Sequence, residues 1–316
     1  AEVRVIDLHA ARVTASLPGL VRYLRRERPM ALLSSLVNAN LVALWAKKIA
    51  GVSTRVVLRI DSPLSHTFAH PRNLRGRLMP ALLRRSYTMA DAVVAVSHGV
   101  ADDFVRTIRA PRERIRVIHN PVVTEHMLAE SYEPVEHPWF AEPRVPIVLA
   151  VGRLTAVKDY PTLLRAFARV RAQRDVRLLI LGEGEERGKL TAQVRALRMD
   201  DAVAMPGFVD NPYAYMRNVQ AFVLSSSYEG FGNVLAEAMA CGTPVMSTDC
   251  PGGPGEILER GRWGALAPVG DDTRLAEAML ATLDNPIPAA LLRQRSQAFS
   301  AETILDQYVE VLCGVA

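Results

Sequence analysis

Residues 225–258 read SSSYEGFGNVLAEAMACGTPVMSTDCPGGPGEIL, and this stretch decides the kind of fold that the chain adopts. The apolar run at 221–227 is expected to form a strand that ends in the loop 229–232, whose two glycines let backbone amides approach a ligand closely. A helix is expected to begin near Asn233, and Gly242 suits the left-handed residue that closes such a helix. A strand followed by a loop and a helix is the repeating unit of a parallel α/β sheet.

The same alternation runs through the rest of the chain, where short Val-, Ile- and Leu-rich runs are separated by longer helical patterns. Apolar runs of this kind are typical of strands that are buried on both faces of a sheet. Strands are expected at 3–8, 30–35, 55–60, 92–97, 115–120, 146–152, 176–182, 202–208, 221–227, 243–248 and 264–269. Helices are expected at 17–28, 39–49, 75–90, 99–109, 162–173, 185–198, 233–240, 272–283 and 301–313. The sequence therefore predicts an α/β fold with two Rossmann-like lobes, whose parallel sheets face a central cleft.

A proline-rich segment separates the two lobes. The length of 316 residues fits two domains at about 150 residues each. Residues 126–145 contain three prolines and no helical period, which predicts a linker. The expected domains are an N-terminal lobe at 1–125, a C-terminal lobe at 146–299 and a C-terminal helix at 300–316 that joins the first lobe.

Composition excludes several classes of protein. Hydrophobic residues make up 49% of the chain and charged residues 22%, which excludes a disordered chain. No run of about 18 uncharged apolar residues occurs, so a membrane-spanning helix is not expected. The three cysteines are too few for a disulfide framework and indicate a reducing cytoplasm.

Charge is distributed unevenly along the chain. Residues 1–120 contain 20 Lys and Arg against 8 Asp and Glu, a net charge of +12, whereas residues 121–316 have a net charge of −7. The asymmetry indicates an N-terminal lobe that faces an anionic partner, or else an arginine-rich composition with solvated faces. The basic residues gather in two clusters, Arg22, Arg25, Arg26 and Arg28, and Arg72, Arg75, Arg77, Arg84 and Arg85. These clusters suggest a peripheral contact with an anionic membrane.

The loop and helix after strand 221–227 predict an anion site, because a helix N-terminus offers free N–H groups and a positive dipole. Glu229 and Glu237 flank this site, and eight residues of helix would separate them by about 12 Å. That separation suits the two ends of a nucleotide sugar, with one carboxylate on the sugar and the other on the ribose. The alternative is that Glu229 caps the helix and Glu237 is a solvated helix residue.

A second candidate anion site lies in VGRLTAVKDYPTLLRAF, residues 151–167. Arg153 and Lys158 follow a predicted strand, where two cations could neutralise a leaving diphosphate. Two unpaired surface cations are the alternative. No phosphate-binding loop of the G-x-x-x-x-G-K-[ST] type and no G-x-S-x-G elbow occurs. Acidic residues and wrong spacing around Gly182 and Gly184 disfavour a nicotinamide-dependent oxidoreductase, and no metal site is expected.

Together these motifs resemble the retaining glycosyltransferases of family 4 (glycosyl transferases group 1), which have the GT-B fold. The resemblance covers most of the chain and rests on AVVAVSHGV and IRVIHNP (92–121), VGRLTAVKDYPTLLRAF (151–167), MPGFVDNPYAYM (205–216), the E-x7-E element (229–237) and GRWGALAPVGD (261–271). It implies an acceptor-side first lobe and a donor-binding second lobe. It also implies that the chain starts late in the first lobe, without the family's first strand and glycine loop.

The resemblance further implies a role for each candidate residue. Arg153 and Lys158 are expected to bind the donor diphosphate, Glu237 the ribose, and Glu229 the hydroxyls of the transferred sugar. Gly207 and Phe208 are expected near the base. Contacts with sugar and phosphate are expected from the backbone amides of Gly230, Phe231, Gly232 and Asn233. Many members carry a His at the end of the strand that matches 55–60, whereas this chain has Asp61 there.

The function that the sequence predicts is transfer of a sugar from a nucleotide-diphosphate sugar, with UDP preferred, to a saccharide or lipid-linked acceptor. No metal, cofactor or nucleic-acid partner is expected. The resemblance implies retention of configuration through front-face attack, so that Glu229 positions the donor and does not attack it. The alternatives are another GT-B enzyme, such as a nucleotide-sugar epimerase or a phosphorylase, and a nucleotide-binding fragment without activity.

Overall fold

The structure of the chain is a computed structural model that describes residues 3–68, 74–141 and 145–314. The chain divides into two compact units. Unit 1 contains Ala1–His119 and Leu305–Ala316, and unit 2 contains Asn120–Ile304. Each unit is built around its own parallel sheet, which provides a carboxyl edge where loops can gather functional side chains.

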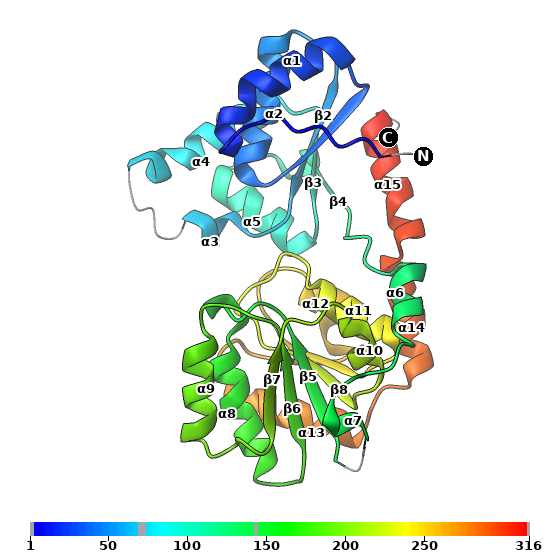
Figure 1. Cartoon of the computed structure of the whole chain (residues 1–316). Helices are drawn as coiled ribbons and strands as arrows, with labels where there is room; N and C mark the ends of the chain where they lie inside the picture. Colours follow the sequence, from blue (N-terminus) through cyan, green and yellow to red (C-terminus); the bar gives the residue numbers. More distant parts are fainter. Residues whose placement is uncertain (1–2, 69–73, 142–144, 315–316) are drawn as a thin grey trace. The chain divides into compact units, whose positions relative to one another are not determined.

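Unit 1 contains a four-stranded parallel sheet in the order β1-β2-β3-β4 (Figure 1). Its strands are β1 (Ala31–Ser35), β2 (Arg55–Ile60), β3 (Ala92–Ala95) and β4 (Ile115–Val117). Its helices are η1 (Val13–Ser16), α1 (Leu17–Glu27), α2 (Val37–Ala50), α3 (Leu64–Phe68), α4 (Leu74–Tyr87), α5 (His98–Ile108) and η2 (Arg112–Arg114). Helix α1 packs on α2 through a small core that includes Val21, Leu24 and Ala46.

The last helix, α15 (Ala301–Cys313), starts in unit 2 and ends in unit 1. Polar contacts bind it to the sheet of unit 1. The Arg59 guanidinium donates to the Tyr308 hydroxyl at 3.1 Å, and the Arg55 guanidinium donates to the Val311 carbonyl at 2.8 Å. The end of the chain is therefore part of the first unit of the fold.

Unit 2 contains a six-stranded parallel sheet in the order β10-β9-β8-β5-β6-β7. Its strands are β5 (Ile147–Val151), β6 (Arg177–Leu181), β7 (Val203–Gly207), β8 (Ala221–Leu224), β9 (Val245–Thr248) and β10 (Ala265–Ala267). Its helices before α15 are α6 (Glu125–Glu130), α7 (Pro138–Ala141), η3 (Ala156–Lys158), α8 (Tyr160–Arg171), α9 (Arg187–Ala196), α10 (Pro212–Arg217), α11 (Asn233–Cys241), α12 (Pro254–Ile257), η4 (Glu259–Gly261), α13 (Asp272–Asp284), α14 (Ala289–Ser296) and η5 (Gln297–Phe299).

Helices cover both faces of the sheet of unit 2, and α8 and α9 lie side by side on one of them (Figure 1). Helix α13 shares that face, where Phe167 and Leu275 are buried in one apolar cluster with Val148 and Ile180 of the strands. Helices α10, α11 and α14 pack together on the other face. Burial on both faces explains why the strand sequences are continuously apolar.

The structure confirms the predicted α/β fold with two parallel sheets. The strand predicted at 3–8 is wrong, because these residues form no strand. Val3 and Val5 are 86% and 90% exposed, so no neighbouring strand or helix buries the apolar side chains. The segment 126–145, predicted to have no helix, also differs, because α6 (Glu125–Glu130) extends into it. Thr124 caps this helix by accepting from the Met127 amide.

Gly182 and Gly188 of unit 2 differ in whether a larger side chain would fit, which allows a matched test. A Cβ on Gly182 would lie 2.0 Å from the Gly152 carbonyl oxygen, at a backbone φ of +138°, whereas a Cβ on Gly188 in α9 would contact nothing within 4 Å. We expect Gly182→Ala to lower the free energy of unfolding by about 1–3 kcal/mol, because the loops after β5 and β6 are forced apart.

The control variant Gly188→Ala should be neutral or stabilising by up to about 1 kcal/mol, because alanine favours helix over glycine. Urea unfolding followed by circular dichroism measures both values. Equal stability of the two variants would contradict the close contact between the loops.

Candidate active site

The order of strands in unit 2 locates the site. From β5 the chain first adds β6 and β7 on one side, and then returns to add β8, β9 and β10 on the other. Strands β5 and β8 are therefore neighbours at the point where the order reverses. Ligands of open α/β sheets bind at the carboxyl edge beside such a switch point. The loops that follow β5 and β8 carry the predicted cations and the glutamate Glu229.

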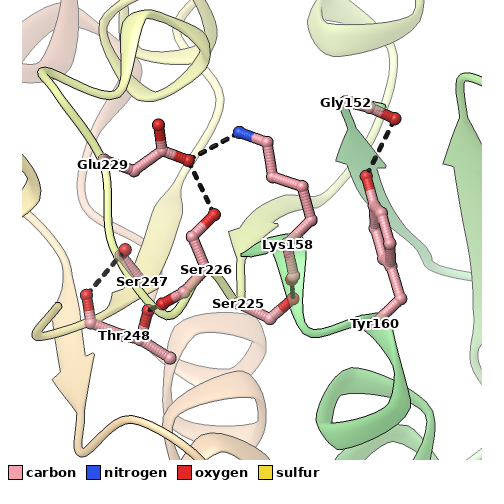
Figure 2. A network of polar contacts seen from close by, with 8 residues as sticks. All are labelled: Gly152, Lys158, Tyr160, Ser225, Ser226, Glu229, Ser247 and Thr248. Carbon is pink, nitrogen blue, oxygen red and sulfur yellow. Dashed lines mark hydrogen bonds and ion pairs between the residues drawn. The ribbon is translucent and has the colours of Figure 1, made fainter. Parts of the chain in front are cut away.

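Lys158 and Glu229 form an ion pair between these two loops (Figure 2). The Lys158 ammonium lies 2.5 Å from Glu229 Oε1, and the side chains are only 19% and 14% exposed. Ser226 Oγ donates to the same carboxylate oxygen at 2.6 Å. Two residues that lie 71 positions apart in the sequence thus form one small polar centre.

Further hydrogen bonds fix the loops that carry the pair (Figure 2). Ser225 Oγ donates to the Lys158 carbonyl at 2.6 Å, and the Tyr160 hydroxyl donates to the Gly152 carbonyl at 3.1 Å. Thr248 Oγ1, at the end of β9, donates to the Ser226 carbonyl at 2.6 Å. These bonds hold the side chains of the pair in place, because the loop backbone around them has little freedom to move.

Gly252 and Gly253 allow the backbone after β9 to approach the Glu229 loop closely. The Glu229 amide donates to the Pro251 carbonyl at 3.0 Å. A Cβ on Gly252 would lie 1.8 Å from the Glu229 carbonyl oxygen, and a Cβ on Gly253 would lie 2.3 Å from the Phe231 carbonyl oxygen. The sequence PGGPGEIL therefore supports the glutamate loop by lying directly against its backbone.

Glu237 occupies the second turn of α11 in a less solvated position. Burial of its carboxyl group raises the pKa of Glu237 to about 7, while the charge of Lys158 acts in the opposite direction. Burial also raises the pKa of Tyr213 in α10, and the charge of Glu237 adds to this effect. The two carboxylates of the E-x7-E element thus differ. Glu229 is paired with a cation, whereas Glu237 is buried and has a raised pKa.

A cavity of about 660 Å³ opens beside the loop after β5. Arg153, Phe208 and Tyr213 are among its lining residues, together with Glu183 and Asp210. Phe208 is 73% exposed, which is unusual for an aromatic side chain. Arg153 is exposed and makes no ion pair with any residue that the structure describes. An aromatic face and an unpaired guanidinium suit a ligand with a flat ring and an anionic group.

The remaining predicted residues line up along the same edge. Gly207 has a φ of +105° and accepts through its carbonyl from the Gly182 amide, so it shapes the loop before Phe208. Phe231 is 2% exposed and packs edge-on against Phe299, so its side chain belongs to the core. Gly232 caps α11 with a φ of +95°, and no side chain caps this helix. Asn233 is exposed, and its Oδ1 accepts from Asn120.

Several supporting residues, Tyr160 and Thr248 among them, were absent from the predicted site. Ser225 and Ser226 follow β8 directly, and two serines at the carboxyl end of a predicted strand were a signal that could have identified them. Tyr213 gave no such signal, because its proximity to the cavity and to Glu237 depends on how α10 packs against α11. Gly230 lies in the loop between β8 and α11, as predicted.

The structure describes the whole of the first predicted basic cluster and part of the second. Arg22, Arg25, Arg26 and Arg28 are all exposed. Arg84 and Arg85 are exposed as well, whereas Arg72 and the side chains of Arg75 and Arg77 lie outside what the structure describes. Of the two leucines that precede Arg84, Leu83 is fully buried and Leu82 is 41% exposed.

Two features are absent from the residues that the structure describes. No helix there has the length and apolar character needed to cross a membrane. No three His, Cys, Asp or Glu side chains in that part of the chain are grouped closely enough to hold a metal ion.

Two family models match consecutive parts of the chain. The model described as Glycosyltransferase Family 4 matches residues 2–126, and the model described as Glycosyl transferases group 1 matches residues 145–285. Together the two matches cover most of the chain, and both describe glycosyltransferase domains. The second match contains the whole site described above, from Arg153 to Glu237.

Curated relatives agree with this assignment. The chain is 28% identical, over 87% of its length and 74% of the relative's, to a Campylobacter jejuni protein named N-acetylgalactosamine-N,N'-diacetylbacillosaminyl-diphospho-undecaprenol 4-alpha-N-acetylgalactosaminyltransferase. It is 33% identical, over 71% of its length, to the lipopolysaccharide core biosynthesis glycosyltransferase LpsE of Rhizobium meliloti. The match spans 64% of LpsE, slightly less than two thirds of that protein.

Solved structures show the same fold. HepE from Anabaena, solved in complex with UDP and glucose, is 22% identical and superposes with a TM-score of 0.77 over 95% of this chain and 82% of HepE. A glycosyltransferase from Rickettsia africae is 15% identical, with a TM-score of 0.77 over 99% of this chain and 83% of that one. These likenesses confirm the two-lobed GT-B fold that the sequence predicts.

The raised pKa of Glu237 has a consequence for stability. Because its pKa is higher in the folded state than the ordinary value of 4.5, the folded protein binds the proton more tightly, and ionisation of Glu237 destabilises the fold as pH rises from about 4.5 to 7. We expect Glu237→Gln, which cannot ionise, to be more stable than the parent protein by roughly 1–3 kcal/mol at pH 8.

The difference should vanish near pH 4.5, where the parent side chain is neutral as well. Urea unfolding at both pH values measures it. A variant that is less stable than the parent at pH 8 would show that the glutamate is not desolvated.

Proposed function

We propose that the protein is a retaining glycosyltransferase that transfers a hexosyl or N-acetylhexosaminyl group from a nucleotide-diphosphate sugar, preferably a UDP-sugar. The acceptor is a saccharide or a lipid-linked saccharide used in the synthesis of cell-surface polysaccharide or glycoconjugate. The observation that carries the proposal is the Lys158–Glu229 pair at the switch point, beside a cavity lined by Arg153 and Phe208. The names of the relatives support the substrate class, since one acts on a diphospho-undecaprenol-linked saccharide and another in lipopolysaccharide core synthesis.

In the proposed donor complex, each part of the nucleotide sugar meets a group of matching chemistry. The base lies in the cavity near Gly207 and Phe208. The ribose hydroxyls contact Glu237, and the diphosphate contacts Arg153, Lys158 and the uncapped N-terminus of α11. The hydroxyls of the sugar contact Glu229. No metal or cofactor takes part.

The proposed reaction needs no protein nucleophile. An acceptor hydroxyl attacks the anomeric carbon from the face that the diphosphate leaves, so that the new C–O bond forms as the old one breaks. The proton of the hydroxyl passes to the departing phosphate oxygen. Arg153, Lys158 and the α11 dipole stabilise the negative charge that develops on the diphosphate. Glu229 holds the sugar in position throughout.

The two glutamates of the E-x7-E element should have separable effects on binding. Glu237→Ala should weaken UDP and the UDP-sugar alike, by roughly 1–3 kcal/mol, because the ribose loses its hydrogen-bond acceptor. Glu229→Ala should weaken the UDP-sugar, because the sugar loses its carboxylate contact. It should leave free UDP unchanged or bind it more tightly, because free UDP carries no sugar and Lys158 is released from its ion pair. Isothermal titration calorimetry with both ligands measures the four affinities.

A loss of UDP affinity in Glu229→Ala as large as the loss of UDP-sugar affinity would remove the role assigned to Glu229. Nucleotide release, measured with and without an acceptor, distinguishes a transferase from a protein that only binds the nucleotide. The anomeric configuration of the product, read by NMR, tests retention.

A peripheral contact between unit 1 and an anionic membrane is the remaining part of the proposal. Helix α1 supports it, because Arg22 and Arg26 lie one turn apart and are both exposed. Basic residues near an anionic surface contribute about 1 kcal/mol each. A few of them would hold the protein at the membrane reversibly, within reach of a lipid-linked acceptor.

Vesicle co-sedimentation tests this contact. The protein should sediment with vesicles that contain phosphatidylglycerol but not with phosphatidylcholine vesicles, and high salt should release it. Replacing Arg22 and Arg26 with Gln should reduce the bound fraction several-fold. The matched control replaces the exposed arginines Arg195 and Arg198 of unit 2 and should bind as the parent does. Equal recovery of the parent protein with both kinds of vesicle would rule the contact out.

A further inference from the structure

Unit 1 contains a pocket that the proposed reaction does not use. Its volume is about 250 Å³, and residues from the end of α4, the end of α5 and the start of β4 line it. It opens at the amino ends of β3 and β4, marked by Val93 and Ile115. Functional loops of parallel sheets gather at the opposite, carboxyl edge. The pocket is therefore separate from the part of unit 1 where an acceptor is expected.

The floor of the pocket is apolar. Phe104 and Ile108 are 1% and 2% exposed, and Ile115 is 4% exposed, so the pocket reaches into the hydrophobic core. The rings of Tyr87 and Phe104 are tilted against each other, with 4.9 Å between their centroids. Such a surface favours a hydrocarbon group over a sugar or a base, because it offers almost no hydrogen-bond partners.

Three arginines also line this pocket: Arg84, Arg109 and Arg114. All three are exposed, and none forms an ion pair with a residue that the structure describes. Nearby arginines behave differently, since Arg112 pairs with Asp102 and Arg116 pairs with Glu310. Arg114 also donates to the Ala90 carbonyl at 3.5 Å, so the apolar pocket is bordered by three guanidinium groups that have no carboxylate partner among the described residues.

An apolar floor with cations at its mouth matches a molecule that has a hydrocarbon chain and an anionic head group. The volume is below the range of about 300–1,000 Å³ that encloses a whole drug-sized ligand. It suits one end of a larger molecule whose remainder stays outside. Guanidinium groups bind phosphate oxygens in pairs of parallel hydrogen bonds.

We propose that this pocket is a specific site for an anionic phospholipid. The end of an acyl chain lies against Phe104 and Ile108, and Arg84, Arg109 and Arg114 bind the phosphate. The site goes beyond the diffuse attraction proposed for α1, because it requires a cavity of fixed shape as well as charge. It does not depend on the nucleotide site of unit 2.

Short-chain lipids test the site without a bilayer, so that the outcome is independent of membrane docking. Dihexanoyl phosphatidylglycerol, titrated into the whole chain as monomers and followed by calorimetry, should bind at least tenfold more tightly than dihexanoyl phosphatidylcholine. Inorganic phosphate at the same concentration should bind at least tenfold more weakly, because it lacks the chain.

Two variants address the two halves of the site. Ala110→Trp places a large side chain in the lining and should abolish binding. The double variant Arg109→Gln, Arg114→Gln should weaken it at least tenfold. The matched controls are Ala196→Trp in unit 2 and the double variant Arg22→Gln, Arg26→Gln on α1, both of which should bind as the parent does. Thermal unfolding of each protein establishes that it is folded.

The proposal is overturned if the two lipids bind equally, if Ala110→Trp binds as the parent does, or if the α1 variant loses as much affinity as the pocket variant. Phosphate that binds as tightly as the lipid also overturns it, since the apolar floor would then contribute nothing. Loss of lipid binding in both pocket variants, with both controls unaffected, establishes the site.

Discussion

The position of β5 between β6 and β8 is the constraint on which the site depends. Only at this point do loops from two separate halves of unit 2 leave the sheet side by side. Lys158 and Glu229 meet there because β5 and β8 are hydrogen-bonded neighbours. With a different strand order the chain would still contain Lys158 and Glu229, but the two side chains would not meet.

Much of this arrangement could be predicted from the sequence, because parallel strands buried on both faces have a strong apolar signal. The run RVVLRI at 55–60 coincides with β2, and the helix predicted at 301–313 coincides with α15. The prediction at 3–8 was wrong for a physical reason. Alternating valines indicate a strand only where another element covers them, and none of the elements that the structure describes covers Val3 and Val5.

The site could be predicted as a set of residues, whereas its internal bonding could not. Glycine loops, a helix N-terminus and two glutamates have recognisable spacing within one segment. The ion pair between Lys158 and Glu229 joins positions 71 residues apart, and the support from Gly252 depends on a backbone contact. The raised pKa of Glu237 follows from burial, which no local pattern encodes.

The ion pair of Lys158 bears on how a product would leave the proposed donor site. The ammonium group already has a carboxylate partner, so an incoming diphosphate competes with Glu229 for it. A complete nucleotide sugar in the proposed pose compensates Glu229 with sugar hydroxyls, so both charged groups remain partnered. After transfer, a nucleoside diphosphate has no sugar hydroxyl to contact Glu229, so the carboxylate forms its ion pair with Lys158 again. The ion pair between Lys158 and Glu229 would then favour exchange of the spent nucleotide for a fresh donor.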